Sequence, residues 1–497
     1  MGRWLGALLA VSLMPVAVAP RAAREDQIFV VAPNGDDANP GSEALPWRTI
    51  QKACNDTPPG STVAIRTGTY NEKVIVRVSG DEGAGFITFR PHGDGPVVID
   101  GNGREGDNLV LISNCSFLRF EGLTLTRNRA RDGSAVRVTG SGEHIELRDL
   151  TITEIRGSNA MGITVYGTSP LTPISDLVID GNEIADCDPA ESEALVVNGN
   201  VTRFAITNNV VHDVDNVGID MIGGEGTCPE PANDAAREGI CRGNLVYRAR
   251  SSYGGGFAGG IYVDGGRDIV VEGNVVTECD IGIEIGAENR KARARNVVVR
   301  NNLIFNNDKI GLAFGGYDYD TTGKVLDCVF TNNTLVANDS LGRGFGEVLV
   351  QAAEGNRFFN NLVVANPQGL LLRSPALGAV GNTFDYNLYF VTDAAVRPAF
   401  FWNGALRQGW GAYRDASGQD AHSLLADPQL VRVAPSAPDL HLLRTSPARD
   451  AGDPSFVPAP GEVDIDGEPR RMGVAVDIGA DELVVSERPV RRRVGSR

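Results

Sequence analysis

The sequence is poor in cysteine, histidine, aromatic and basic residues. Seven cysteines in 497 residues are too few for a disulfide scaffold, and five histidines with no CxxC pair argue against a zinc site. A formal net charge of −17 argues against nucleic acid or an anionic membrane as the main partner, because both attract basic surfaces. Aromatic residues make up only 6% of the chain, which argues against a broad stacking surface for carbohydrate.

The N-terminal segment has the layout of a secretory signal. Arg3 precedes the apolar core 5–18, and Ala17-Val18-Ala19 fits a cleavage site. We therefore expect residues 1–19 to be a signal peptide and the mature chain to be secreted, to the extracellular space or the periplasm, without a membrane span. An uncleaved anchor helix is the alternative, which the short run broken by Pro15 disfavours.

The sequence is rich in glycine, with 60 residues, and in one repeated phrase, in which β-forming residues flank a polar residue and an asparagine. A repeat of this length with about three short strands predicts a β-solenoid rather than a sandwich or a propeller. The asparagines should form a ladder, since each amide can bond the amide of the next coil. Eight asparagines hold this position, 26 to 35 residues apart: Asn182, Asn209, Asn244, Asn274, Asn302, Asn333, Asn361 and Asn387.

This repeat resembles the right-handed parallel β-helix proteins of the pectate-lyase-like superfamily. The resemblance implies an all-β chain: a right-handed parallel β-helix over 61–400, with a helical N-terminal cap at 27–60 and an irregular C-terminal cap at 401–497. Within the first cap, a short helix at about 47–55 should cover the first coil. Solenoid ends need such covers, because an open strand edge promotes aggregation.

A second recurring phrase reads GIDMIGG, GIYVDGG, GIEIGAE and GLAFGGY, beginning at residues 218, 260, 282 and 311. Side chains alternate along a strand, so Ile219 and Met221 should point inward and Asp220 outward. Stacked coil on coil, the same outward position reads Thr164, Val196, Asp220, Tyr262, Glu284 and Ala313. Asp220 and Glu284 should then lie roughly 9–10 Å apart.

The outward acids and the basic run ENRKARAR that follows Glu284 are the candidate site residues. A solvated sheet face is the plain alternative, but polar groups gather on only three coils. A lyase acting on a uronate polymer must neutralise the uronate carboxylate, remove a proton and protonate the leaving oxygen. By analogy with superfamily lyases, we expect calcium as a cofactor and the following roles: metal ligands Asp215, Asp220, Asp280 and Glu284; catalytic groups Tyr262, Arg290, Lys291 and Lys309; substrate-binding groups Asp264, Arg293 and Arg295.

Two phrases resemble particular lyase families. NVGIDMI (216–222) is similar to the metal-binding phrase of polysaccharide lyase family nine, but Asn216 and Val217 replace its two acids. Ala313 stands where that family has its catalytic lysine. GIEIGAENRK (282–291) is similar to the calcium-and-lysine phrase of family six, which implies that Glu284 is a ligand, although the basic residue is displaced by one position.

We therefore expect a monomeric, secreted protein that acts on an extracellular polysaccharide, with β-elimination of a uronate polymer as the first hypothesis. Hydrolysis by two carboxylates is the second. A non-catalytic carbohydrate-binding or surface protein is the third, although we expect Trp402, Trp410, Tyr386 and Tyr389 to pack the C-terminal cap. Cys228 and Cys241 flank a polar insertion and could form a disulfide across it.

Overall fold

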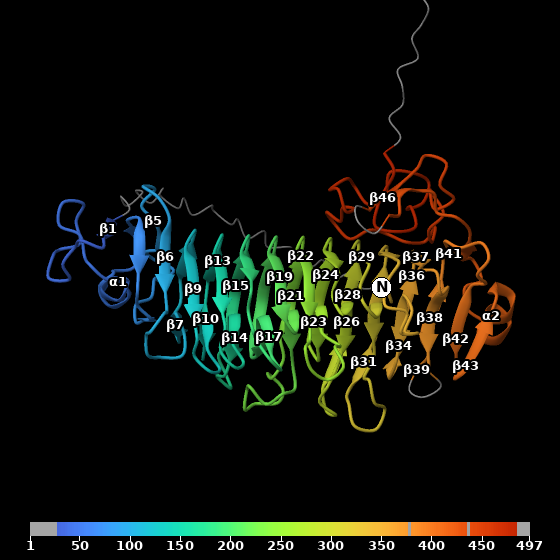
Figure 1. Ribbon diagram of the computed structural model, residues 1–497, viewed down its shortest axis with the longest axis horizontal. Coiled ribbons are helices and arrows are strands. Elements are labelled where there is room, and N and C mark those ends of the chain that lie inside the picture. The colour runs from blue at the N-terminus through green and yellow to red at the C-terminus, as the bar shows by residue number, and fades with distance from the viewer. Residues whose placement is uncertain (1–26, 376–378, 435–437, 485–497) are drawn as a thin grey trace, which may run out of the picture.

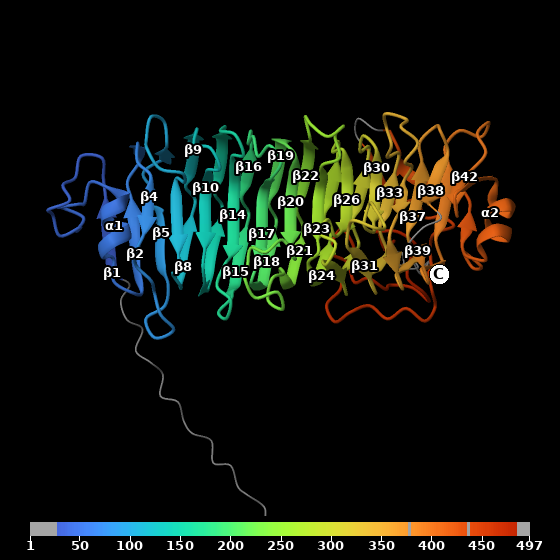
Figure 2. The same ribbon diagram turned by 90° about the horizontal axis from the view of Figure 1, so that it is seen from below.

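The protein is a right-handed parallel β-helix, described here from a computed structural model that covers residues 27–375, 379–434 and 438–484. The predicted signal peptide lies outside these residues. The chain winds into a long solenoid whose coils follow one another along its axis (Figures 1 and 2). Three long sheets run along it. In the described ranges, no helix is long and apolar enough to cross a membrane.

One sheet, called the site sheet below, carries the second recurring phrase. Its strands stack in parallel in chain order, except for the last, which is antiparallel. They are β4 (Val74–Val76), β7 (Val110–Ser113), β10 (Ser134–Thr139), β14 (Met161–Gly167), β17 (Glu193–Gly199), β20 (Val217–Ile222), β23 (Gly259–Asp264), β26 (Ile281–Gly286), β30 (Ile310–Phe314), β34 (Val348–Val350), β38 (Leu370–Ser374), β42 (Ala399–Trp402) and β43 (Ala405–Gln408).

The C-terminal segment packs against a second sheet, called the tail sheet below. Its strands are β3 (Gly68–Tyr70), β6 (Val97–Asp100), β9 (Thr124–Asn128), β13 (Thr151–Ile155), β16 (Glu183–Ala185), β19 (Val210–Asp215), β22 (Leu245–Arg250), β25 (Val275–Thr277), β29 (Leu303–Phe305), β33 (Thr334–Val336), β37 (Leu362–Ala365), β41 (Leu388–Val391) and β44 (Leu424–Leu425).

The third sheet, the wide sheet, has 18 strands. They are β1 (Gln27–Val31), β2 (Ser61–Ile65), β5 (Ile87–Pro91), β8 (Leu118–Glu121), β11 (Gly142–Glu143), β12 (Ile145–Arg148), β15 (Ile174–Asp180), β18 (Val201–Thr207), β21 (Arg237–Arg242), β24 (Arg267–Glu272), β27 (Arg293–Arg295), β28 (Val298–Arg300), β31 (Lys324–Leu326), β32 (Val329–Thr331), β35 (Ala353–Glu354), β36 (Arg357–Phe359), β39 (Ala379–Val380) and β40 (Thr383–Asp385). Two further strands, β45 (Leu430–Arg432) and β46 (Asp439–Leu442), pair antiparallel in the tail.

The predicted asparagine ladder is present and holds the coils in register. The side-chain amide of each of the first seven asparagines donates to the side-chain oxygen of the next, from Asn182 to Asn387, over 2.9–3.3 Å. Each oxygen also accepts the backbone N–H of the preceding asparagine, for example Asn244 N–H to Asn274 over 2.9 Å. Because these groups are buried, the ladder satisfies polar atoms that water cannot reach.

The predicted register of the site sheet is also confirmed. Cross-strand pairs join Thr164 to Val196, Val196 to Asp220, Asp220 to Tyr262, Tyr262 to Glu284 and Glu284 to Ala313. The residues on either side of Asp220 belong to the hydrophobic core, as the strand alternation requires. The outward column is therefore one continuous row of side chains.

Both ends of the solenoid are covered by helices. Helix α1 (Ile50–Asp56) buries Ile50, Ala53 and Cys54 over the first coil, and Thr49 caps its N-terminus. Helix α2 (Trp410–Ser417) closes the other end, where Tyr413 stacks on Phe400 with ring centroids 4.1 Å apart. The aromatic residues expected in this cap, Trp402, Trp410, Tyr386 and Tyr389, make ring contacts here.

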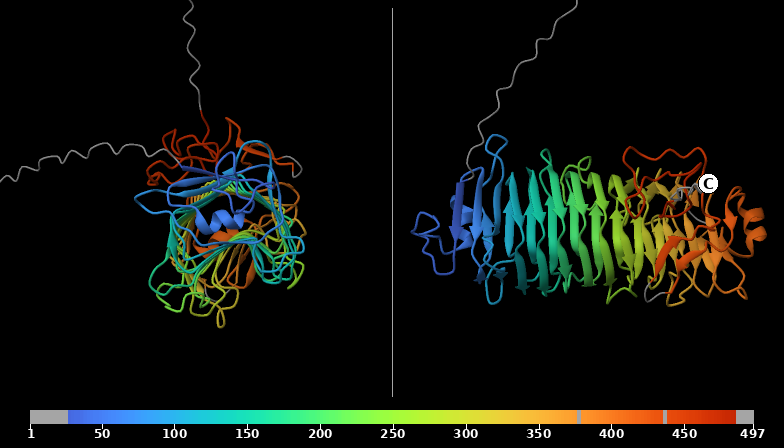
Figure 3. Two further views of the ribbon diagram at one scale, coloured as in Figure 1. Left: turned by 90° about the vertical axis from the view of Figure 1, so that its left-hand side faces the viewer. Right: turned by 90° about the horizontal axis from the view of Figure 1, so that it is seen from above.

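The C-terminal segment differs from the expected end cap. Beyond α2, residues 424–434 and 438–483 turn back and lie along the flank of the solenoid (Figures 1 and 3). Leu440 and Ile478 pack there against Leu362 and Val364, which the tail sheet turns outward. The reason is that this part of the sheet has an apolar outer face, which the segment removes from water.

The polar insertion between Cys228 and Cys241 carries no disulfide. All seven cysteines lie in the described part of the chain, and each is a buried free thiol. Cys241 belongs to the hydrophobic core, whereas Cys228 sits in the insertion and contacts the carbonyl of Ser169. The insertion is held instead by Asp234, whose carboxylate accepts the backbone N–H groups of Gly226 and Cys228 over 2.6 and 2.9 Å.

Candidate functional site

A cavity of about 730 Å³ opens on the outer face of the site sheet, where β17, β20, β23, β26, β30 and β34 follow one another. None of the described residues that line it is a lysine, arginine or histidine. Seven carboxyl groups line it: Glu191, Glu193, Asp220, Glu225, Asp264, Glu284 and Glu288. The cavity is therefore strongly acidic and has no side-chain cation of its own.

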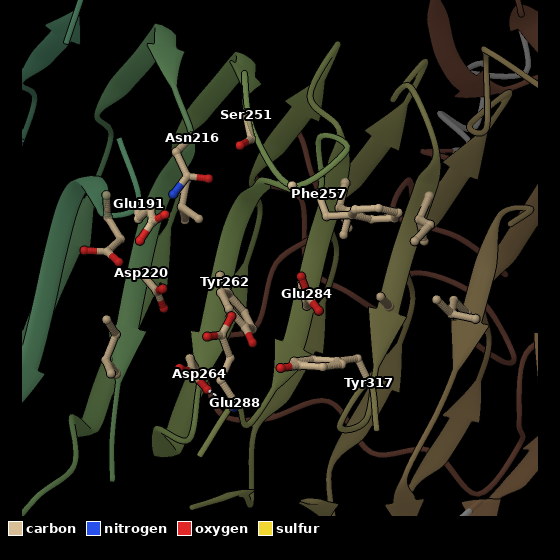
Figure 4. Close-up of a pocket in the computed structure, with 18 of the residues that line it drawn as sticks. Glu191, Asn216, Asp220, Ser251, Phe257, Tyr262, Asp264, Glu284, Glu288 and Tyr317 are labelled. Atoms are coloured by element: carbon tan, nitrogen blue, oxygen red, sulfur yellow. Dashed lines mark hydrogen bonds between the residues drawn. The ribbon is translucent and has the colours of Figure 1, made fainter. Parts of the chain in front are cut away.

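The middle of the cavity is formed by the outward column of the site sheet. Figure 4 shows Tyr262 between Asp220 and Glu284, one strand from each. Strand spacing places the backbones of Asp220 and Glu284 roughly 9–10 Å apart. The tyrosine has room because residue 286 on the next strand is glycine: a Cβ atom there would lie 2.7 Å from the Tyr262 hydroxyl.

Burial and mutual repulsion favour the protonated, uncharged form of these acids. Asp220 is 2% exposed, and burial together with the nearby Glu193 and Asp264 raises its pKa well above the ordinary value. Burial also raises the pKa of Glu193, Asp264 and Glu284, each to about 8. Tyr262 is buried beside them, and its pKa is raised well above 10. Several of these groups can thus hold a proton at neutral pH.

The acids differ in their hydrogen-bond partners. Asp264 accepts the backbone N–H of Glu288 over 2.6 Å, and Glu225 accepts the Asn198 side-chain amide over 2.8 Å. In contrast, Oδ1 of Asp220 is buried and has no hydrogen-bond partner among the described residues. An unpaired buried acceptor is costly, so Asp220 lacks a partner that a ligand can provide.

The other half of the cavity is apolar. Ile281, Ile310, Ala313 and Leu349 form a small cluster on the outer face of the sheet, and Phe345 packs against it. Aromatic side chains stand around this floor, with Tyr317 65% exposed, Phe257 47% exposed and Tyr253 37% exposed. The cavity thus combines an acidic half with a half that can contact the apolar face of a ring.

Two of these aromatics belong to the segment 251–258, SSYGGGFA, called the aromatic loop below. Asp280 accepts the backbone N–H groups of Ser251 and Ala258 over 2.8 and 3.1 Å. Asp215 accepts the backbone N–H and hydroxyl of Ser252 over 2.8 and 2.9 Å. The Lys309 ammonium donates to the carbonyls of Gly255 and Gly256 and lies 4.0 Å from the Phe257 ring centroid.

The predicted acids, Tyr262 and Lys309 therefore separate into two groups. Asp220, Tyr262, Asp264 and Glu284 line the cavity. Asp215, Asp280 and Lys309 do not line it but anchor the aromatic loop through the contacts just described. Neither the loop nor Glu193, Glu225 and Glu288 was singled out from the sequence, although the three consecutive glycines of the loop mark a turn there.

The basic run lies elsewhere. Arg290, Lys291, Arg293 and Arg295 are exposed, and none lines the cavity. Strand β27, which holds Arg293 and Arg295, belongs to the wide sheet, because the chain turns the corner of the coil after Glu288. The Arg293 guanidinium donates to the carbonyl of Arg290 over 2.9 Å. These cations are close to Glu284 in the sequence, but they do not lie on the face of the solenoid that carries the cavity.

The residues expected to hold calcium do not converge. Asp215 and Asp280 face backbone amides of the aromatic loop, whereas Asp220 and Glu284 lie on either side of Tyr262. In the described ranges, groups of three His, Asp or Glu ligands within 4.8 Å of one another occur only outside the cavity. The donor chemistry suits calcium, but these four residues do not form one coordination site as they stand.

Comparisons with known proteins agree with the fold. Residues 238–384 match the family described as the right handed beta helix region. The chain is 33% identical over 472 residues to the uncharacterized protein YwoF of Bacillus subtilis (strain 168), a match that covers 90% of this chain and 99% of the relative.

Solved structures with a similar course of the chain are more distant. A GH136 lacto-N-biosidase from Eubacterium ramulus is 14% identical, with 81% of this chain and 67% of that chain covered and a TM-score of 0.48. Pectate lyase Pel9A is 14% identical, with 92% and 96% covered and a TM-score of 0.47. At this identity no activity is transferred from them. The chain belongs to the same family as YwoF of Bacillus subtilis, and it is a right-handed parallel β-helix protein.

Proposed function

We propose that the protein is a glycoside hydrolase that cleaves a polysaccharide with two carboxyl groups of the acidic cavity, Glu284 as general acid and Asp264 as general base. The observation that carries this proposal is a pair of carboxyl groups with raised pKa values in a cavity whose described lining residues include no lysine, arginine or histidine. Glycoside hydrolysis needs two carboxyl groups and no cation. The preference differs from the expected lyase because none of Arg290, Lys291, Arg293 and Arg295 lines the cavity, and the Lys309 ammonium is bound to carbonyls of the aromatic loop.

Glu284 suits the role of the acid. A general acid must hold its proton at the working pH and release it to the leaving oxygen in the transition state. The Glu284 pKa is raised to about 8, first by burial and then by Glu288 and Asp264. The side chain is half-buried at the centre of the cavity, so its proton can reach a bound glycan.

Asp264 suits the role of the base. Burial and Glu288 raise its pKa to about 8, and the Glu288 N–H, donated over 2.6 Å, limits that rise, whereas Asp220 has no such bond. Asp264 therefore acts as the base when it is the ionised member of a pair that shares one proton with Glu284. Because Asp264 pairs with Gly286 and Tyr262 pairs with Glu284, Asp264 and Glu284 are diagonal neighbours, roughly 8 Å apart along the sheet. Inverting glycosidases hold their carboxyl groups roughly 6.5–9.5 Å apart, with a water molecule between base and sugar. The backbone separation of the pair falls within this range, and we propose inversion at the anomeric carbon.

The shape of the cavity supports a polymeric substrate. It crosses several coils and opens to solvent, and the exposed Tyr317 and Phe257 border it. Aromatic faces bind the apolar faces of sugar rings, and a site that spans several strands can hold more than one sugar.

Uronate β-elimination is a second candidate, and the density of carboxyl groups favours it. Seven acids around one cavity offer many oxygen ligands, and a bound calcium ion could draw some of them together. The ion would supply the neutralisation of the uronate carboxylate. Tyr262, which holds its proton far above neutral pH, would be suited to protonate the leaving oxygen.

One experiment tests both candidates. The purified protein is incubated with neutral, amino and uronate polysaccharides, in calcium and then in chelator. Hydrolysis releases reducing ends without absorbance near 235 nm, whereas β-elimination creates an unsaturated product that absorbs there. Reducing ends that Glu284→Gln and Asp264→Asn both abolish, and that chelator leaves unchanged, support hydrolysis. Absorbance that depends on calcium would overturn it in favour of the lyase, and no product from any polymer would count against both.

A further inference from the structure

We propose that the cavity selects a glycan that carries a positively charged amino group, with the ammonium between Glu193, Asp220 and Glu225 and the sugar ring on the apolar floor. This inference rests on the proposed function, because it names the substrate class of the same site. It differs from the uronate substrate that the sequence suggests, and it follows from the charges that the fold gathers.

The charge of the cavity argues for a cation as the natural occupant. Seven carboxyl groups line it and none of the described lining residues is basic, so those that ionise repel one another. Burial and then Glu225 raise the pKa of Glu193, and burial and then Glu193 raise the pKa of Asp220, so both are disfavoured as anions. A bound ammonium would relieve this repulsion, whereas a uronate would add to it.

Asp220 provides the second observation, independent of the acid count. It is 2% exposed, it lines the cavity, and its Oδ1 atom has no hydrogen-bond donor in the described part of the chain. Buried acceptors are almost always paired, and a charge-assisted bond from an ammonium is the strongest available to a carboxylate. The orphaned oxygen thus marks where a donor from the ligand would bind.

The apolar half explains why the ammonium should belong to a sugar. Ile281, Ile310 and Leu349 form a floor on β26, β30 and β34, and Tyr317 also lines the cavity (Figure 4). A free metal ion would make no use of this floor, and the carboxyl oxygens do not close into a three-ligand group within 4.8 Å. An amino sugar presents both features at once, an ammonium and an apolar ring face.

A matched pair of ligands tests the inference. Short glucosamine oligosaccharides are compared with the same oligosaccharides after full N-acetylation, which removes the charge and keeps the backbone. Affinity is measured by calorimetry on the whole protein near neutral pH, with chelator present and at two salt concentrations. We expect N-acetylation to weaken binding about tenfold or more, since one charge-assisted bond accounts for at least that factor. Higher salt should weaken only the charged ligand.

Variants locate the contact. Asp220→Asn and Glu193→Gln should each lower the affinity for the glucosamine oligosaccharide about tenfold and leave the N-acetylated ligand unaffected. Glu105→Gln is the matched control, because Glu105 is an exposed acid in a loop outside the cavity, and it should change nothing. Circular dichroism and the urea midpoint of each variant report whether it is folded.

The outcomes separate this inference from the proposed function. Preferential binding of the glucosamine ligand without cleavage of any glycan would support the inference and overturn the hydrolase. Cleavage of neutral glycans together with equal affinity for the two matched ligands would leave the hydrolase standing and overturn the inference. Preference for a uronate oligosaccharide would also overturn it.

Discussion

The hydroxyl end of Tyr262 lies over Gly286 on the neighbouring strand, at a distance that leaves no room for a side chain at residue 286. A Cβ atom there would meet the hydroxyl oxygen at 2.7 Å and the ring at 2.9 Å. Gly286 lies in a strand, where alanine is at least as well accommodated by the backbone. The glycine therefore keeps space for the tyrosine between the two acids of the outward column.

The first prediction follows from this contact. Gly286→Ala should move the Tyr262 ring out of its place between Asp220 and Glu284 and lower kcat/KM about tenfold or more, as expected when a positioned group is displaced. The cost to folding should stay within about 1–3 kcal/mol, the range for overpacking. Gly411→Ala is the control, because no atom lies within 4 Å of a Cβ at Gly411. Equal activity of Gly286→Ala and wild type would show that the position of the ring does not matter.

The asparagine repeat was enough to predict the β-helix, because the same hydrogen bond between neighbouring asparagines recurs from coil to coil. Asn209 and its counterparts recur at the same turn, so each amide finds the next, and the register of the site sheet follows from that spacing. Asp220 could therefore be placed beside Tyr262 from the sequence alone. Strand alternation also gave its outward direction, which the core positions of Ile219 and Met221 confirm.

The composition of the cavity could not be predicted in the same way. Glu225 and Phe257 lie in loops whose course depends on anchors in other coils, such as Asp280 beneath the aromatic loop. Arg293 follows Glu284 by nine positions in the sequence, but the chain turns onto the wide sheet between them. Local periodicity fixes which way a strand residue points, but it does not fix where a corner falls or which side chain holds a loop.

A second prediction concerns the anchoring of the aromatic loop by Lys309. Its ammonium donates to the carbonyls of Gly255 and Gly256, and hydrogen bonds to a charged group contribute about 1.5–3 kcal/mol. Lys309→Met should therefore increase loop opening about tenfold or more, seen as faster amide hydrogen exchange at Tyr253 and Phe257.

The kinetic result distinguishes an anchor from a catalytic base. If Lys309 only holds the loop, Lys309→Met should raise KM several-fold, and the pH profile of kcat should keep its shape. Lys324→Met is the control, since Lys324 pairs with Glu354 on the wide sheet. Loss of kcat with unchanged loop exchange would instead return Lys309 to the catalytic role suggested by the sequence.

A third prediction concerns pH and Glu284. Its pKa rises from 4.5 to about 8 on folding, chiefly through burial. The folded state therefore keeps a proton that the unfolded state loses, so this group favours folding most below about pH 4.5 and loses that contribution as the pH rises through about 8. Glu284→Gln has no proton to lose, and its stability relative to wild type should increase by several kcal/mol, up to about 5 kcal/mol, over this range.

Urea unfolding at a series of pH values measures this difference, with the exposed Glu105→Gln as the control. A difference between Glu284→Gln and wild type that does not change with pH would show that Glu284 titrates normally. The same carboxyl should control catalysis: kcat/KM of wild type should fall above about pH 8, where the general acid has lost its proton.

The last prediction concerns the ladder, which sets the spacing on which the cavity depends. The Asn302 side-chain amide donates to the carbonyl of Val271 and to the side-chain oxygen of Asn333, and its own oxygen accepts the backbone N–H and the side-chain amide of Asn274. Asn302→Ala would leave buried partners unpaired on both sides, each at a cost of about 1–3 kcal/mol. We therefore expect a loss of at least about 2 kcal/mol in the free energy of unfolding, measured in urea, whereas Asn289→Ala, at an exposed position, should change it by less than about 0.5 kcal/mol.

Because coils contact mainly their neighbours, the Asn302→Ala substitution should loosen the adjacent coils first. Strand β26, which holds Glu284, should then show increased hydrogen exchange before β10 does. Equal protection of both strands in Asn302→Ala would mean that the solenoid unfolds as one unit and that the ladder stabilises the cavity only through the whole fold.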